Sequence, residues 1–178
     1  MPFTLFHLGP ALPFGLLLLR YIDFPTFLVA SVIADIEPFL VLTLGLNYPL
    51  HGFLHSFLGG TLLAFLLAAA MSKVRSILSP LMSFLKLEQK LSFKRVLSAS
   101  LFGVYLHILL DSPLYSDIRP FYPFDFNPFI SQSMFIGFEV YTLCVLSFLG
   151  GAVIYAIRLF LRRRTVVNRP RSFKQDYY

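Results

Sequence analysis

Four histidines and three carboxylates lie in or beside the long apolar runs of this sequence, where ionisable side chains are rare. They are His7, Asp35, Glu37, His51, His55, His107 and Asp111. An ionisable group in hydrocarbon is costly unless it is paired or bound to a ligand, so each of these residues needs a partner. Imidazole nitrogen together with carboxylate oxygen suits Zn²⁺, Mn²⁺ or Fe²⁺ better than Ca²⁺. The residue types therefore point to a metal site, with zinc as the first expectation.

The spacing of these residues supports the metal interpretation. His51 and His55 are four residues apart, and His107 and Asp111 repeat that spacing. On a helix such pairs share one face and can grip one ion between them. The first ligands that we expect are His55, His107, Asp111 and Asp35, and the next are His7, His51 and Glu37. Seven candidate ligands are more than one tetrahedral ion accepts, and two ions bridged by Asp35 would use them. The sequence leaves open whether the site holds one ion or two.

Two ions bridged by a carboxylate such as Asp35 would form a hydrolytic arrangement, because a bound ion lowers the pKa of water and stabilises developing negative charge. We expect Asp35 and Glu37 to be the catalytic carboxylates, with Glu37 as general base if it does not bind metal. Arg119, in a loop, is a candidate contact for a substrate phosphate. Amide or peptide hydrolysis would use the same ligands and stays open.

The elements that must position these residues are transmembrane helices. Apolar residues make up 57% of the 178 residues and charged residues 13%, with a mean hydropathy of +0.73. An ordinary soluble domain carries about 25% charged residues. Residues 24–46, 52–71 and 134–161 each reach or exceed the roughly 20 residues that cross a bilayer core. The sequence predicts an all-α polytopic bundle of about five transmembrane helices in a single domain, 1–161, followed by a basic tail, 162–178.

The helix boundaries follow from the apolar runs and from the residues that interrupt them. The expected spans are 5–20, 24–46, 51–71, 96–111 and 134–161. Pro38 disfavours helix at the preceding Glu37, so we expect the second span to be broken there. Residues 73–95 contain apolar side chains at helical spacing, which predicts an amphipathic helix on the membrane surface.

The basic residues predict the orientation of the chain. Residues 73–95 and the tail carry most of them and should be cytoplasmic in a multi-pass plasma-membrane protein. The N-terminus and the 112–132 loop then lie outside, and the seven candidate ligands gather near that outer face. Because the basic residues flank apolar runs, we expect membrane lipid as a partner and no nucleic acid. A site at the edge of the outer leaflet suits a lipid-linked substrate that arrives from the bilayer. The sequence does not indicate an oligomeric state.

Four other acids have simpler expectations. Asp23, Asp117 and Asp125 fall in predicted loops and should be solvated. Glu139 lies near the start of the last span, where it is as well suited to support a metal ligand or to pair helices as to bind the metal itself.

The motifs resemble those of the membrane-bound metal-dependent hydrolases. They occur here in the order His7, Ala34-Asp35-Ile36-Glu37, His51-Gly52-Phe53-Leu54-His55-Ser56 and His107-Ile108-Leu109-Leu110-Asp111. That family includes LexA-regulated bacterial inner-membrane proteins and is often compared with zinc-dependent phospholipase C. Its usual pattern is an early His, Pro-Asp-x-Asp, His-Arg-Gly-x-Thr-His-Ser and His-x-x-x-Asp, followed by a loop rich in proline and aromatic residues, as in 112–124 here.

This sequence departs from the family pattern in three places. Ala34 replaces the proline, and Glu37 replaces the second Asp. The two histidines of the pair, His51 and His55, are one residue closer together than in the family pattern, and no arginine lies between them. The resemblance implies a metal-dependent hydrolase that acts on a phospholipid or another lipid-linked phosphoester.

Two alternatives belong to other functional classes. One is a small transporter or channel that moves protons or divalent ions along His and Asp side chains. Residues 64–71 and 96–103, the inner halves of the third and fourth spans, contain no ionisable group, which favours a one-sided pocket over a conduit. The other alternative is a metal-stabilised membrane protein without catalytic turnover.

Overall fold

The computed structural model describes residues 4–167, and every regular element in this part is helical. The elements are η1 (Thr4–His7), α1 (Leu8–Leu17), α2 (Phe24–Ala30), η2 (Ile33–Asp35), α3 (Ile36–Leu44), η3 (Phe53–His55), α4 (Phe57–Val74), η4 (Arg75–Leu78), α5 (Ser79–Phe84), α6 (Phe93–Asp111) and α7 (Ile136–Val167). Of the predicted basic tail, residues 162–167 continue α7 and residues 168–178 lie outside the described residues.

The predicted helical membrane bundle is confirmed. In the described part, four helical segments are long and apolar enough to cross a bilayer, and a fifth apolar helix, Leu5–Leu17, is shorter. The four long segments are Phe24–Leu44, Phe57–Phe84, Phe93–Asp111 and Ile136–Arg164. The shorter helix, Leu5–Leu17, runs through Pro10 and Pro13 and ends at Leu17, where the chain turns towards α2.

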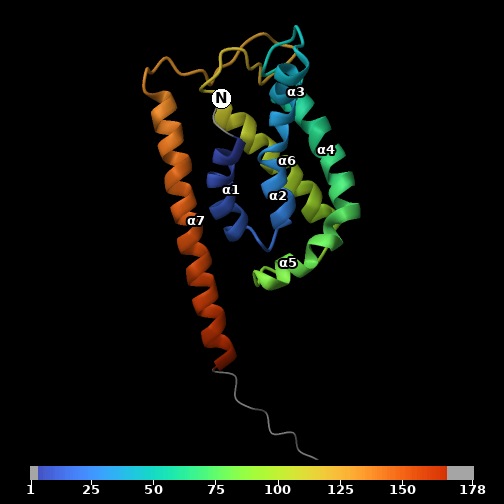
Figure 1. Cartoon of the computed structure of the whole chain (residues 1–178), viewed down its shortest axis with the longest axis vertical. Helices are drawn as coiled ribbons and strands as arrows, with labels where there is room; N and C mark the ends of the chain where they lie inside the picture. The colour runs from blue at the N-terminus through green and yellow to red at the C-terminus, as the bar shows by residue number, and fades with distance from the viewer. Residues whose placement is uncertain (1–3, 168–178) are drawn as a thin grey trace, which may run out of the picture.

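The helices run up and down between two ends of the bundle (Figure 1). Helix α6 packs against both α2 and α4, and α7 packs along α1 at the edge. We call one end the cluster end; it holds η1, α3, η3, the last turn of α6 and residues 112–135. The opposite, basic end holds residues 18–23, η4, α5, residues 85–92 and the last turns of α7.

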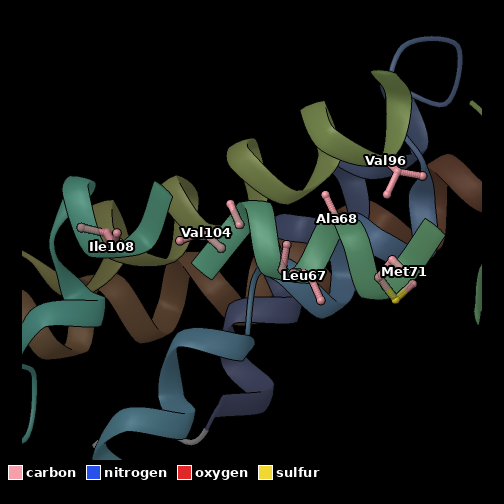
Figure 2. Close-up of a cluster of buried hydrophobic side chains, with 8 residues drawn as sticks. Leu67, Ala68, Met71, Val96, Val104 and Ile108 are labelled. Carbon is pink, nitrogen blue, oxygen red and sulfur yellow. The ribbon is translucent and has the colours of Figure 1, made fainter. Parts of the chain in front are cut away.

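Small residues let these helices approach closely. A Cβ atom on Gly103 of α6 would lie 2.4 Å from the Cβ of Ala30 on α2, and one on Gly9 of α1 would lie 2.3 Å from the carbonyl oxygen of Cys144 on α7. Close packing at small residues holds helices together in lipid, where the hydrophobic effect contributes little between them. Between α4 and α6 the core is apolar and includes Leu67 and Val104 (Figure 2).

The predicted break in the second span is wrong in its position. Helix α3 passes through Glu37 and Pro38, whereas the chain leaves helical geometry earlier, at Val32, with φ −128°. Pro38 is the third residue of α3, where a backbone N–H has no partner within the helix, so proline removes no hydrogen bond.

The predicted start of the third span is also wrong. Helix α4 begins only at Phe57, because Ser56 caps it by accepting a hydrogen bond from the Gly59 N–H at 3.0 Å. His51 therefore lies in the preceding loop and His55 in the short helix η3. The two histidines do not share a helix face, although the loop brings their rings to a centroid distance of 4.9 Å.

The predicted helix within residues 73–95 is short. Helix α4 runs on to Val74, and α5 covers six residues. Ile77 and Phe84 are 75% and 82% exposed, whereas Met82 is buried beside Leu87. The segment thus packs one apolar face against the bundle and leaves other apolar side chains exposed, so the amphipathic surface helix stays a prediction.

Asp23 is not solvated as predicted, because it is buried at the basic end. Its carboxylate accepts a hydrogen bond from Arg75 Nε at 2.7 Å, and the two side chains are only 3% and 4% exposed. The same carboxylate caps α2 by accepting the Thr26 N–H at 3.2 Å. By contrast, the Asp125 side chain is 73% exposed, as predicted, and pairs with Arg119 at 2.8 Å.

Candidate metal centre

Four side chains converge at the cluster end. Asp35 comes from the end of η2, His55 from the end of η3, and His107 and Asp111 from the last turns of α6. Each offers one ligand atom, and these four atoms all lie within 4.8 Å of one another. His55, His107 and Asp111 are buried, and the Asp35 side chain is 12% exposed. We refer to these residues as the four-residue cluster.

Hydrogen bonds fix which ring nitrogens of the two histidines face the centre. His107 Nδ1 lies 2.8 Å from the carbonyl oxygen of Ser31, and His55 Nδ1 lies 2.8 Å from Glu37 Oε2. A carbonyl or carboxylate oxygen accepts, so both Nδ1 atoms are assigned as donors. Both Nε2 atoms then carry lone pairs, and they face each other at 3.3 Å. Metal-binding histidines are typically held in this way through the nitrogen that does not bind the metal.

Carboxylate oxygens complete this group of electron-pair donors. Asp111 Oδ2 lies 3.4 Å from His107 Nε2 and is buried without a hydrogen bond. Asp35 Oδ1 lies 3.6 Å from the same nitrogen. The lone pairs of the two Nε2 atoms and of Asp111 Oδ2 face one another, so these atoms repel unless a cation or a proton joins them. The donor set of two imidazoles and two carboxylates fits one divalent ion and would neutralise its charge.

His7 and Glu37 lie behind the cluster. His7 donates from Nε2 to Asp111 Oδ1 at 3.1 Å, and its ring stacks on His107 at a centroid distance of 4.0 Å. Glu37 holds His55 with one oxygen and accepts the Leu54 N–H at 3.0 Å with the other. The structure therefore places these two predicted ligands where they orient cluster residues, and no second group of three potential ligands forms within residues 4–167.

His51 is also beside the cluster and is held by a residue that the sequence did not indicate. Its Nδ1 lies 3.0 Å from Asp117 Oδ1, and its backbone N–H donates to Asp117 Oδ2 at 3.1 Å. The ring stacks on Tyr115 at 4.1 Å and meets His55 edge-on. Burial is the largest effect on the His51 pKa and lowers it, with the nearby His55 adding to the decrease. Asp117 is thus not simply solvated, as predicted, because it fixes the His51 ring.

A cleft of about 270 Å³ opens on the surface beside His51. Its lining residues are Tyr48, Pro49, His51, Gly52, Phe53, Asp117, Arg119 and Tyr122. Arg119, the predicted phosphate contact, therefore lines the cleft but is not part of the four-residue cluster; its side chain is 53% exposed. Glu139 is exposed on α7 and does not belong to the cluster either.

The hydrogen bond from His55 Nδ1 to Glu37 should contribute to metal affinity, because it orients the His55 ring. Replacing Glu37 with glutamine should lower metal affinity by roughly 10–100-fold, the usual cost of losing a partner that orients a ligand. The amide can no longer accept a charge-assisted hydrogen bond from His55 Nδ1. Titration of metal-free protein with Zn²⁺ measures the change, and Glu139→Gln on the exposed face of α7 is the matched control. Equal affinities in the two variants would show that Glu37 does not support a metal ligand.

Comparison with known proteins identifies the family. Residues 4–169 match the family model of the YdjM inner membrane protein, a range that includes every segment of the metal centre. No curated protein and no solved structure matches the chain. The match agrees with the resemblance to LexA-regulated inner-membrane proteins and with the membrane-capable helices, but it carries no relationship to hydrolases or to phospholipase C. The chain belongs to the YdjM inner membrane protein family.

Proposed function

We propose that this protein is a membrane-embedded metal-dependent hydrolase of a phospholipid or another lipid-linked phosphoester. The observation that carries the proposal is the convergence of two imidazole nitrogens and two carboxylate oxygens within 4.8 Å. A bound divalent ion, Zn²⁺ before Mn²⁺ or Fe²⁺, would supply Lewis acidity and lower the pKa of water.

Some carboxylates of this centre position other side chains, and others can take part in proton transfer. Both carboxylate oxygens of Glu37 are engaged, which favours a positioning role over that of a free general base. Asp35 is the most exposed of the four cluster residues and is the stronger candidate to take a proton from water. The neutral charge balance of two carboxylates and one divalent ion leaves the site able to accept an anionic phosphoester.

The cleft beside His51 supports a lipid-linked substrate. Arg119 lines it and can donate hydrogen bonds to a phosphate, after exchanging its exposed partner Asp125. Aromatic side chains surround this end of the bundle, and Tyr122, Phe124 and Phe126 are 45%, 67% and 54% exposed. Exposed aromatic residues are typical of the membrane interface, so a substrate would reach the cleft from the bilayer.

The distribution of charge supports an outward-facing site. Among the described residues, every Lys and Arg except Arg119 lies on a segment at the basic end or on the adjoining turns of α4, α6 and α7. By the positive-inside rule the basic end is cytoplasmic, which puts the N-terminus and the four-residue cluster on the outer side of the plasma membrane.

A transporter is the weaker alternative. The buried pair of Asp23 and Arg75 does place charge at the basic end. However, the core between α4 and α6, which includes Leu67, Ala68 and Val104, separates this pair from the cluster with apolar side chains (Figure 2). That layer favours a one-sided pocket over a conduit.

A non-catalytic metal-stabilised protein would share the same cluster, so only an activity assay separates it from a hydrolase.

The test is hydrolysis of phospholipids by detergent-purified protein, with and without a chelator. We expect release of a phosphorylated product that stops on chelation and returns when Zn²⁺ is restored. Asp35→Asn should lose this activity, whereas the loop variant Asp125→Asn should keep it. Turnover that survives chelation would overturn the mechanism. Bound metal without turnover on phosphoester or amide substrates would indicate a structural role, and ion flux in liposomes would indicate a transporter.

A further inference from the structure

A second cavity lies far from the metal centre and is almost entirely apolar. It has a volume of about 420 Å³ and lies between α1, α2 and α7, above the loop that follows α5. Side chains that line it include Leu16, Leu28, Leu87, Phe148 and Ala152. Among the described residues, the lining of this groove exposes almost no polar surface, so its chemistry suits a hydrocarbon chain better than a polar ligand.

At the basic end, the loop that follows α5 closes the groove and is held to α7 by hydrogen bonds. Tyr155, in the groove wall, donates its hydroxyl hydrogen to the carbonyl oxygen of Leu85 at 2.8 Å. Two turns further along α7, Arg162 donates to the carbonyl oxygen of Lys86 at 2.8 Å and to Glu88 at 3.0 Å. These bonds tie the loop to α7, so the groove keeps its floor.

Positive charge gathers at this floor. Phe148, Ala152, Tyr155, Arg158 and Arg162 follow each other at spacings of three or four residues, which puts them on one face of α7. The two arginines therefore lie directly beyond the apolar groove on the groove side of the helix. Lys86 joins them from the loop, between two residues that line the groove, and Glu88 is the one nearby acid on that loop within the described residues.

The backbone at Lys86 adds to this pattern. Lys86 has φ +56°, the left-handed conformation that usually selects glycine at the end of a helix. It closes α5 by donating its N–H to the carbonyl oxygen of Ser83 at 2.9 Å. A lysine at a position that favours glycine is consistent with a use for its charged side chain.

We propose that this groove binds an acyl chain of an anionic phospholipid whose phosphate lies among Lys86, Arg158 and Arg162. The apolar length of the groove and the basic groups at its end match the two halves of such a lipid. The bound lipid would fill the space between α7 and the α1–α2 pair, which α7 otherwise contacts mainly through α1. The groove lies at the opposite end of the bundle from the metal centre, and lipid binding there does not depend on the proposed hydrolase activity.

Native mass spectrometry of the detergent-purified chain with phosphatidylglycerol or phosphatidylcholine tests this proposal. We expect one phosphatidylglycerol to bind with about tenfold preference, since each basic residue near a lipid surface contributes on this scale. Ala152→Phe, which fills the groove from an exposed position on α7, should abolish that binding. Combined Lys86→Gln and Arg158→Gln should remove the preference. Arg162 stays unchanged because it holds the loop.

The matched control removes the same charge elsewhere, through Lys94→Gln with Arg163→Gln, two exposed residues that do not line the groove. This control should keep the preference. Equal binding of the two lipids by the wild-type chain would overturn the proposal. So would a preference that survives Ala152→Phe, or one that the control removes as fully as the Lys86 and Arg158 variant does. Thermal unfolding of each variant checks that the bundle is intact.

Discussion

Replacement of Asp111 by asparagine is expected to lower metal affinity by more than about a hundredfold, beyond the range for residues that only support a ligand. The substitution keeps the shape of the side chain and can keep the hydrogen bond from His7. It removes one of the two negative charges of the four-residue cluster. Hydrolytic turnover should fall below detection in the same variant. Metal titration and the phospholipid assay measure the two losses, and Asp125→Asn, in an exposed loop position, is the control.

The same variant should behave differently without metal. Asp111 Oδ2 lies 3.4 Å from His107 Nε2, and in the metal-free protein both atoms carry lone pairs. An asparagine NH₂ in that position can donate to the imidazole, which should raise the free energy of unfolding by about 1 kcal/mol, the usual net value of a hydrogen bond. Asp111→Asn should therefore stabilise metal-free protein and destabilise metal-loaded protein relative to wild type. A variant that is destabilised equally in both states would show that Asp111 has only a structural role.

Replacement of Arg75 by methionine should lower the free energy of unfolding by about 3–5 kcal/mol, because it leaves the Asp23 carboxylate buried without a countercharge. The pair joins the start of α2 to the end of α4, with Arg75 Nε 2.7 Å from Asp23 Oδ1. Unfolding in mixed detergent measures the loss. Adding Asp23→Asn should restore part of it, since the uncompensated charge is then removed.

A matched control uses the exposed ion pair at the same end of the bundle. Arg162 and Glu88 are each 48% exposed, so Arg162→Met should release the loop locally but change the free energy of unfolding of the bundle little. If Arg75→Met and Arg162→Met have the same effect, the buried pair does not hold α2 and α4 together.

The sequence predicts most of the helices because their signal is local. Long apolar runs identify the membrane-capable segments, and the structure begins and ends three of the four long segments within three residues of those runs. The exception is the third predicted span, whose segment begins at Phe57 and continues well beyond Met71. The errors occur where one local rule has two outcomes. Pro38 can break a helix or occupy its first turn, and here it lies in the first turn of α3. Likewise, the four-residue spacing of His51 and His55 predicts a helix face only if the helix has already begun, and Ser56 starts it later.

The candidate site was also predicted where local sequence sufficed and missed where contacts between distant residues decide. The residue types and their places at one end of the spans predict that Asp35, His55, His107 and Asp111 could meet, and the structure brings them together. The partners that hold them are harder to predict. Asp117 reaches His51 across 66 residues of sequence, from a loop with no spacing pattern that would single it out.

The buried ion pair was missed for the same reason. Asp23 and Arg75 are 52 residues apart, and each taken alone resembles an ordinary charged residue at a helix end. Only the packing of α2 beside the α4 segment shows that both are withdrawn from solvent. The division of the seven predicted ligands into a four-residue cluster and its supports also depends on tertiary hydrogen bonds, such as that from His55 to Glu37.

Anomalous X-ray scattering from crystals of Zn²⁺-loaded protein is the sharpest test of the proposed metal centre, because it locates the metal itself. We expect one anomalous peak at the cluster end, from an ion bound by the Nε2 atoms of His55 and His107 and by carboxylate oxygens of Asp35 and Asp111. A peak held by other residues, or zinc-loaded crystals in which those four side chains point apart and bind no ion, would contradict it.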